Sequence, residues 1–351
     1  MRRVGVTIGK FMPLHKGHEL MIEFGAAMMD ELQVVVSGNE TDLISLTTRY
    51  NWVRQFVYEK RLNNVGVHLH IDKSPTPINI DKDGTVLDVD FQFYWANVFT
   101  KIDRRITHIV SSDKYGQAIA DRMNLEWLPV DPGREMVEIS ATKIRKDPTK
   151  YFKYISDVAK PYYVKKVAIV GPESTGKSTL VKSLGKFLNG SIVHEYGRTV
   201  SEAKKNKLDA DDFLAIARGQ DALIDIAVRN AATPLVVIDT EALTTYLFSK
   251  IYLDSPKDII LDFAADQEID LYVVLAPTVA WVDDGTRVAG NQADREQFFE
   301  DLVGLLEHNK RQYIIVDETD YVLRQTQAAT GIYNFVNQRL TQTQTECINN
   351  M

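Results

Sequence analysis

The sequence predicts an α/β protein of two doubly wound domains, each built on a parallel sheet. Short apolar strands and amphipathic helices alternate along both halves of the chain, as they do when helices cover both faces of a parallel sheet. Each half also opens with a strand that runs into a glycine-containing turn and then a helix. A chain of 351 residues is long enough for two domains that each bury a core.

The elements expected in the first half follow from the spacing of its apolar residues. Short apolar runs predict strands at residues 4–8, 33–37, 65–71 and 108–110. Helical spacing predicts helices at residues 19–29, 48–60 and 92–104, and a further one that begins at 140. The Asp- and Gly-rich stretch 81–90 is expected to be a loop.

The second half repeats this alternation after a break at residues 156–161. Pro161 disfavours helix at the residue before it, which places the boundary between domains 1–158 and 159–351. Strands are expected at residues 165–170, 191–195, 234–239, 271–275 and 313–316. Helices are expected at residues 178–188, 210–232 and 321–340, with others that begin near 202 and 292.

Composition excludes several classes of protein. The net charge of -7 argues against a dedicated nucleic-acid binder, although a local basic patch can still bind phosphate esters. The single cysteine, Cys347, excludes an internal disulfide and fits a reducing cytoplasm. No apolar run approaches the ~20 residues of a membrane span. We therefore expect a cytoplasmic protein with no membrane contact.

A phosphate-binding loop stands near the middle of the chain. Residues 171–179 read Gly-Pro-Glu-Ser-Thr-Gly-Lys-Ser-Thr, the G-x-x-x-x-G-K-S pattern, between an apolar strand and a helix. Its glycines let backbone N–H groups converge on a phosphate at the helix N-terminus. Lys177 is expected to reach the β- and γ-phosphates of ATP, and the Ser178 hydroxyl to bind Mg²⁺. The other nucleotide-binding residues of this loop are Gly171, Glu173, Ser174, Thr175, Gly176 and Thr179. An ordinary glycine-rich turn is the alternative.

A pair of histidines marks a second candidate site, where the first strand meets the first helix. His15 and His18 flank Gly17, whose lack of a side chain allows close backbone approach to a phosphate. Two solvated surface histidines are the alternative. Downstream, Ser140 is a plausible helix N-cap, and the first turns of that helix carry a hydroxyl and two cations suited to a triphosphate: Thr142, Lys143 and Arg145. An ordinary capped helix explains this second stretch equally well.

The two stretches together resemble the HxGH and ISxTxxR signatures of the nucleotidyltransferase superfamily. Further motifs narrow the resemblance to the NadR type, in which a nicotinamide mononucleotide (NMN) adenylyltransferase is joined to a ribosylnicotinamide kinase. In the first half these motifs are residues 9–18, 48–52, 111–116 and 131–134. In the second half they are residues 171–179, 195–198, 239–241 and 281–287. The resemblance implies a Rossmann-like transferase domain followed by a P-loop kinase domain.

For the first domain, the resemblance implies adenylyl transfer from ATP to NMN, which gives NAD and pyrophosphate. The attacking phosphate is already ionised, so positioning and charge neutralisation suffice without a general base. We assign His15 and His18 to the α- and β-phosphates. The rest of the triphosphate is assigned to Lys10, Ser140, Thr142, Lys143 and Arg145. Gly9, Phe11 and Gly17 are further expected nucleotide-binding residues, at the turn after the first strand.

For the second domain, the resemblance implies phosphorylation of nicotinamide riboside to NMN. A neutral hydroxyl acceptor benefits from a carboxylate base near the loop. Asp239 is favoured as the Mg²⁺ ligand and general base, and Glu195 for contact with the ribose or the base of the substrate, although these roles could be exchanged. Arg198 and Arg287 are expected to neutralise the phosphoryl group, with 281–287 as a lid.

Several alternatives stay open. Some members of the NadR type carry an N-terminal helix-turn-helix repressor. Here Met1 lies directly before the first strand, so we expect no DNA binding. The resemblance suggests a homo-oligomer. A nucleotidyltransferase–kinase fusion that acts on another small phosphorylated substrate, or an ATP-binding regulatory switch, would fit the two phosphate motifs alone.

Overall fold

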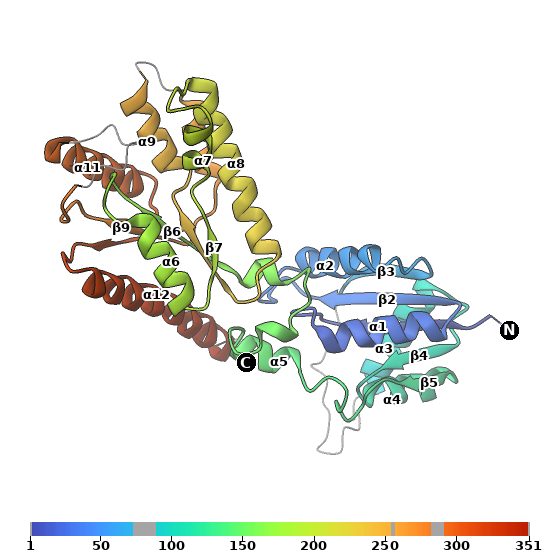
Figure 1. The fold of residues 1–351 in the computed structure, drawn as a ribbon. Helices are drawn as coiled ribbons and strands as arrows, with labels where there is room; N and C mark the ends of the chain where they lie inside the picture. The colour runs from blue at the N-terminus through green and yellow to red at the C-terminus, as the bar shows by residue number, and fades with distance from the viewer. Residues whose placement is uncertain (1, 73–88, 254–256, 282–290, 350–351) are drawn as a thin grey trace. The chain divides into compact units, whose positions relative to one another are not determined.

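The computed structural model describes residues 2–72, 89–253, 257–281 and 291–349, with only the backbone of residues 89–92 and 337–349. The chain divides into two compact units, Met1–Ala159 and Lys160–Met351. Each unit contains a five-stranded sheet, in the order β3-β2-β1-β4-β5 in the first and β10-β9-β6-β8-β7 in the second (Figure 1). All neighbouring strands are parallel, and each sheet grows on both sides of its first strand. The predicted doubly wound fold class is therefore confirmed for both domains.

The first unit places its helices on both faces of the sheet. Its strands are β1 (Val4–Gly9), β2 (Glu31–Gly38), β3 (Val65–Ile71), β4 (His108–Ser111) and β5 (Glu126–Pro129). Its helices are α1 (Lys16–Met28), α2 (Leu46–Glu59), α3 (Val89–Ile102), α4 (Tyr115–Met123) and α5 (Ala141–Lys146). Val4, Val6 and Ile8 of β1 pack in one cluster with α3 and α4. Thr7 points the other way and donates to the Met21 sulfur of α1, at 3.4 Å.

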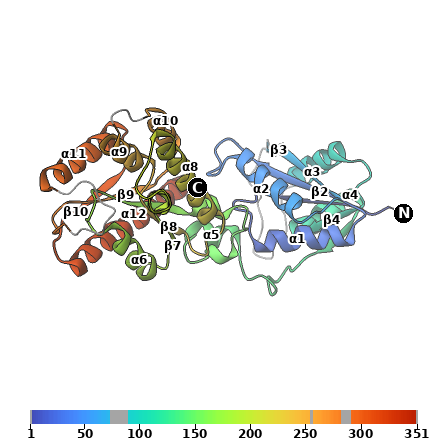
Figure 2. The ribbon, with the colours of Figure 1, turned by 45° about the horizontal axis from the view of Figure 1, so that its top comes forward.

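The second unit is built in the same way. Its strands are β6 (Lys165–Val170), β7 (Ser191–Val193), β8 (Leu235–Asp239), β9 (Leu271–Leu275) and β10 (Tyr313–Val316). Its helices are α6 (Lys177–Phe187), α7 (Tyr196–Ala203), α8 (Ala210–Arg229), α9 (Ala242–Tyr252), α10 (Ile259–Asp266), α11 (Gln292–His308) and α12 (Tyr321–Asn349). Figures 1 and 2 show α6 and α12 on one side of this sheet and α8 and α9 on the other.

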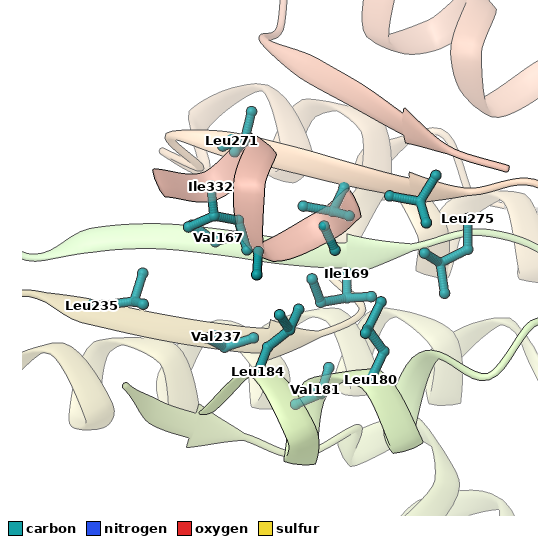
Figure 3. Close-up of a cluster of buried hydrophobic side chains, with 14 residues drawn as sticks. Val167, Ile169, Leu180, Val181, Leu184, Leu235, Val237, Leu271, Leu275 and Ile332 are labelled. Carbon is teal, nitrogen blue, oxygen red and sulfur yellow. The ribbon is translucent and has the colours of Figure 1, made fainter. Parts of the chain in front are cut away.

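The core beneath the phosphate-binding loop joins distant parts of the second unit. Leu180 and Leu184 of α6 point toward Ile169 and Val237 of the sheet, and Ile332 of α12 lies over Val167 (Figure 3). These side chains are almost completely buried. The loop therefore stands on a rigid base that includes residues more than 100 positions downstream.

Some elements differ from those expected. α9 was not anticipated, because most of its residues are apolar or buried all round and leave no helical stripe in the sequence. α7 begins at Tyr196 rather than near 202, because β7 ends at Val193. α12 continues to Asn349 rather than ending near residue 340. Across the described ranges, no helix is both long and apolar enough to cross a bilayer.

Candidate active sites

The histidine turn follows β1 and is closed by its own side chain. His15 is the N-cap of α1, and its Nδ1 accepts from the backbone N–H of Gly17 at 3.2 Å and of His18 at 3.4 Å. The two imidazoles stack with centroids 3.7 Å apart, and the Phe11 ring meets His18 edge-on at 4.8 Å. A side chain at position 17 would approach the His15 ring to 3.2 Å, so this tight turn favours glycine.

Both histidines are held neutral. Burial, reinforced by the Arg134 guanidinium, lowers the pKa of His15 to about 3. Burial and the neighbouring His15 hold the pKa of His18 well below its usual range. Because Nδ1 of His15 accepts hydrogen bonds, its proton resides on Nε2. The ring can therefore donate from Nε2 to an anionic oxygen.

Arg145 joins the Ser140 helix to the histidine turn. Its guanidinium donates to the Met12 carbonyl at 2.7 Å and to the Thr142 hydroxyl at 3.3 Å. Ser140 caps α5 by accepting from the Lys143 N–H at 3.3 Å. The structure thus brings together the two stretches that lie about 120 residues apart in the sequence.

The remaining predicted residues of this site divide into two groups. Phe11 lies against His18, and a side chain at Gly9 would come within 3.2 Å of the Phe11 ring. Lys10, in contrast, is paired with Asp42, with Nζ 2.9 Å from Oδ1. A phosphate would have to compete with that carboxylate for the Lys10 ammonium.

Sequence reasoning assigned no role to two arginines of the first domain. Arg49 is fully buried and donates to the Lys10 and Ser37 carbonyls and to the Asp42 carboxylate. It therefore holds together the backbone at the carboxyl ends of β1 and β2. Arg134 lies 3.4 Å from Asp113 and acts on both histidines through its charge. Both stand in motifs quoted above, but only tertiary structure shows what they face.

The phosphate-binding loop has the backbone that its sequence requires. Gly171 has φ +141°, and a side chain there would lie 2.7 Å from the Leu275 carbonyl oxygen. Gly176, the N-cap of α6, has φ +85°. The Lys177 ammonium donates to the Gly171 and Pro172 carbonyls, at 2.9 Å each. The Lys177 ammonium is therefore tied to the loop backbone at the N-terminus of α6.

Two carboxylates lie close to this loop. Asp239 ends β8 and is 1% exposed. Burial raises its pKa, against the Ser178 hydrogen bond and the Lys177 charge. Burial likewise raises the pKa of Glu195, and Asp239 adds to this, while Lys177 opposes it. Within the part of the chain that the structure describes, Oδ1 of Asp239 is buried with no hydrogen-bond partner. A buried carboxylate oxygen beside a hydroxyl suits a hard cation such as Mg²⁺.

A pocket of about 290 Å³ opens over the loop. Among the predicted residues, it is lined by Glu173, Ser174, Thr175, Gly176, Lys177, Ser178, Thr179, Glu195 and Arg198. Arg198 lies 3.6 Å from Glu195, and the Glu173 carboxylate accepts from the Tyr252 hydroxyl at 2.9 Å. Arg287 and residues 282–286 of the expected lid lie outside the described residues, as does most of the predicted loop 81–90.

Arg324 was also not anticipated from the sequence. It is 2% exposed and donates to the carbonyls of Thr175 in the loop, Ala276 after β9 and Glu318 before α12. Its carbonyl partners are far apart in sequence, so no local pattern could have revealed it. Arg324 fixes the back of the loop.

Two α/β domains, each with a phosphate-binding turn off the carboxyl end of its first strand, define a two-domain nucleotide-handling enzyme. A family model described as an AAA domain matches residues 166–324. The chain is 31% identical over 337 residues to the trifunctional NAD biosynthesis/regulator protein NadR of Escherichia coli strain K12, and covers 80% of that protein with 91% of its own length. It is 30% identical over 342 residues to the Salmonella typhimurium protein of the same name, with the same coverage. The chain belongs to the NadR family, which confirms the resemblance drawn from its motifs.

Solved structures agree at the level of the whole chain. A crystal structure of a NadR protein in complex with NAD and AMP-PNP has a TM-score of 0.73 and 25% identity, covering 96% of this chain and 97% of that one. A second NadR structure, in complex with NR, has a TM-score of 0.73 and 24% identity, covering 95% of this chain and 96% of that one.

Proposed function

We propose that this chain is a bifunctional enzyme of NAD biosynthesis. Residues 159–351 transfer the γ-phosphate of ATP to the 5′-hydroxyl of nicotinamide riboside, and residues 1–158 transfer AMP from a second ATP to the resulting NMN. NAD and pyrophosphate are the products. The relatives named NAD biosynthesis proteins support this proposal, and so does the related structure that holds NAD and AMP-PNP.

For the kinase, the observation that carries the proposal is the grouping of Lys177, Ser178 and Asp239 at one loop. Lys177 neutralises the transferring phosphoryl group, and Arg198 adds a second positive charge. Ser178 and Asp239 would hold Mg²⁺, which neutralises charge on the β- and γ-phosphates when bound. Asp239 and Glu195 both remain candidates for the base that accepts the hydroxyl proton, with Asp239 favoured.

For the adenylyltransferase, the neutral histidine pair carries the proposal. His15 donates from Nε2 to a phosphate oxygen, and His18 stacks beside it. Arg145, Lys143 and the capped end of the Ser140 helix neutralise the pyrophosphate part. No group needs to accept a proton, because the NMN phosphate is already ionised.

The partners required by this proposal are small molecules: ATP, nicotinamide riboside, NMN and NAD. We extend it to a cytoplasmic location without nucleic-acid or membrane partners, supported by the negative net charge and the lone cysteine. A homo-oligomer is part of the same proposal through the family resemblance.

One assay tests the proposal directly. Protein, ATP, Mg²⁺ and nicotinamide riboside are mixed, and NMN and NAD are separated by chromatography over time. We expect NMN to appear first and NAD to follow, and supplied NMN to give NAD without the riboside. ATP binding without either product would favour a regulatory switch. Turnover of other phosphorylated acceptors in place of NMN would favour a different transferase–kinase fusion.

A further inference from the structure

Gln220 of α8 is a buried polar residue to which the proposed kinase mechanism assigns no role. It is 1% exposed, and its amide bonds three backbone groups. Oε1 accepts from the Tyr196 N–H at 2.8 Å. Nε2 donates to the Asp239 carbonyl at 3.1 Å and to the Thr240 carbonyl at 3.3 Å. With the amide reversed, its NH₂ group would face the Tyr196 N–H, which is also a donor, and its oxygen would face two carbonyl oxygens, which are also acceptors. These contacts therefore fix the orientation of the amide.

The backbone groups that Gln220 holds belong to the two turns that carry the candidate carboxylates. Asp239 is the last residue of β8, and Thr240, which follows it, has φ +62°, a strained value for a β-branched residue. Tyr196 is the first residue of α7, directly after Glu195. The two turns follow different strands, β7 and β8, and the Gln220 amide connects them.

We propose that Gln220 is the positioning residue of the phosphoryl-transfer site, which sets the placement of Asp239 and Glu195 relative to the loop. This inference rests on the proposed kinase function. Both amide N–H groups are used by carbonyls, so the side chain acts through the backbone even though it reaches the pocket wall. Without it, two buried carbonyls and one N–H lose their partner, and the strained Thr240 is released to relax. A carboxylate displaced by about 1 Å can cost about a hundredfold in rate.

The test compares Gln220→Leu with Gln267→Leu. Gln267 is a matched control, because it is also buried and bonds the far end of the β8–α9 turn. It accepts from the Ala242 N–H at 3.2 Å and donates to Asp221 at 2.9 Å, but it does not bond Asp239, Thr240 or Tyr196. Gln220→Glu is a second variant, which keeps an acceptor for Tyr196 but loses the donors to β8. Riboside phosphorylation, its Mg²⁺ dependence, adenylyl transfer and the melting temperature are measured for each.

We expect Gln220→Leu and Gln220→Glu to lower kcat of riboside phosphorylation by about tenfold to a hundredfold and to raise the Mg²⁺ concentration needed for half-maximal rate. Adenylyl transfer by the same chains should be unchanged, and Gln267→Leu should keep kcat within about twofold. The inference is overturned if Gln220→Leu and Gln267→Leu have the same kcat and Mg²⁺ requirement, or if both activities of Gln220→Leu fall together. If the wild type phosphorylates the riboside and Gln220→Leu does so with the same kcat and Mg²⁺ requirement, only this inference is wrong. If the wild type itself does not phosphorylate the riboside, the proposed function is wrong as well.

Discussion

At the scale of single residues, His15 uses its two ring nitrogens for different tasks. Nδ1 closes the first turn of α1, and Nε2 carries the proton that a phosphate oxygen can accept. The capping role and the proposed catalytic role can therefore be separated by a side chain that caps the helix but has no donor at the position of Nε2. Asparagine is such a side chain.

We predict that His15→Asn keeps the fold and loses adenylyl transfer. Removing a donor to developing negative charge costs about a hundredfold to a thousandfold in kcat. His15→Ala should lose the same activity and, in addition, about 1 kcal/mol of stability, because the cap is gone. Melting temperatures and NAD formation from supplied NMN measure the two effects, with riboside phosphorylation as the internal reference. Near wild-type NAD synthesis by His15→Asn would refute the assignment.

Lys177 is the corresponding residue of the second domain. We predict that Lys177→Ala eliminates riboside phosphorylation, because the loop loses the ammonium group that we assign to the γ-phosphate. Adenylyl transfer from supplied NMN should be spared. Lys182→Ala is the matched control, since it removes an exposed lysine from the same helix. Equal kinase rates in the two variants would exclude Lys177 from the reaction.

At the scale of elements, the phosphate-binding loop depends on backbone space behind it. We predict that Gly171→Ala disrupts the loop, since its φ is +141° and the new Cβ would meet the Leu275 carbonyl at 2.7 Å. Riboside phosphorylation should fall by at least about tenfold. Gly304→Ala in α11 is the control, because nothing lies within 4 Å of its Cβ position and alanine favours a helix by about 1 kcal/mol. A Gly171→Ala protein with an unchanged kinase rate and melting temperature would contradict the description of the loop.

The elements also show how far the sequence could be interpreted. The loop at 171–179 and the strands β1, β6, β8 and β9 carry strong local signals, namely fixed glycine spacing and unbroken apolar runs. α9 carries none, because a helix buried on many sides has no polar face. The link from Arg145 to Met12 and the one from Gln220 to Asp239 join residues from separate elements, so their roles depend on the fold. The catalytic roles themselves stay predictions.

At the scale of the whole molecule, the two sites should respond differently to acid. Burial raises the pKa of Glu195, so as pH falls this carboxylate protonates above the usual value of about 4, and we expect kinase activity to fall there. His15, with its pKa lowered to about 3, stays neutral over the same interval, and so does His18. We predict that kcat of riboside phosphorylation declines on acidification, whereas the His15 and His18 imidazoles do not titrate near pH 6.5. The kinase rate and the imidazole NMR signals are measured on one preparation between about pH 5 and 8, and titration of either imidazole in that interval would disprove neutral histidines.

The contacts of α12 have a consequence for synthesis of the chain on the ribosome. Arg324 holds Thr175 from behind, and Ala328, Ala329 and Ile332 complete the apolar layer under β6. The phosphate-binding loop is translated some 150 residues before α12, the helix that supports it. During that interval the apolar side of β6 and α6 lacks the α12 residues that cover it, so we expect the second domain to complete its core only after α12 has left the ribosome.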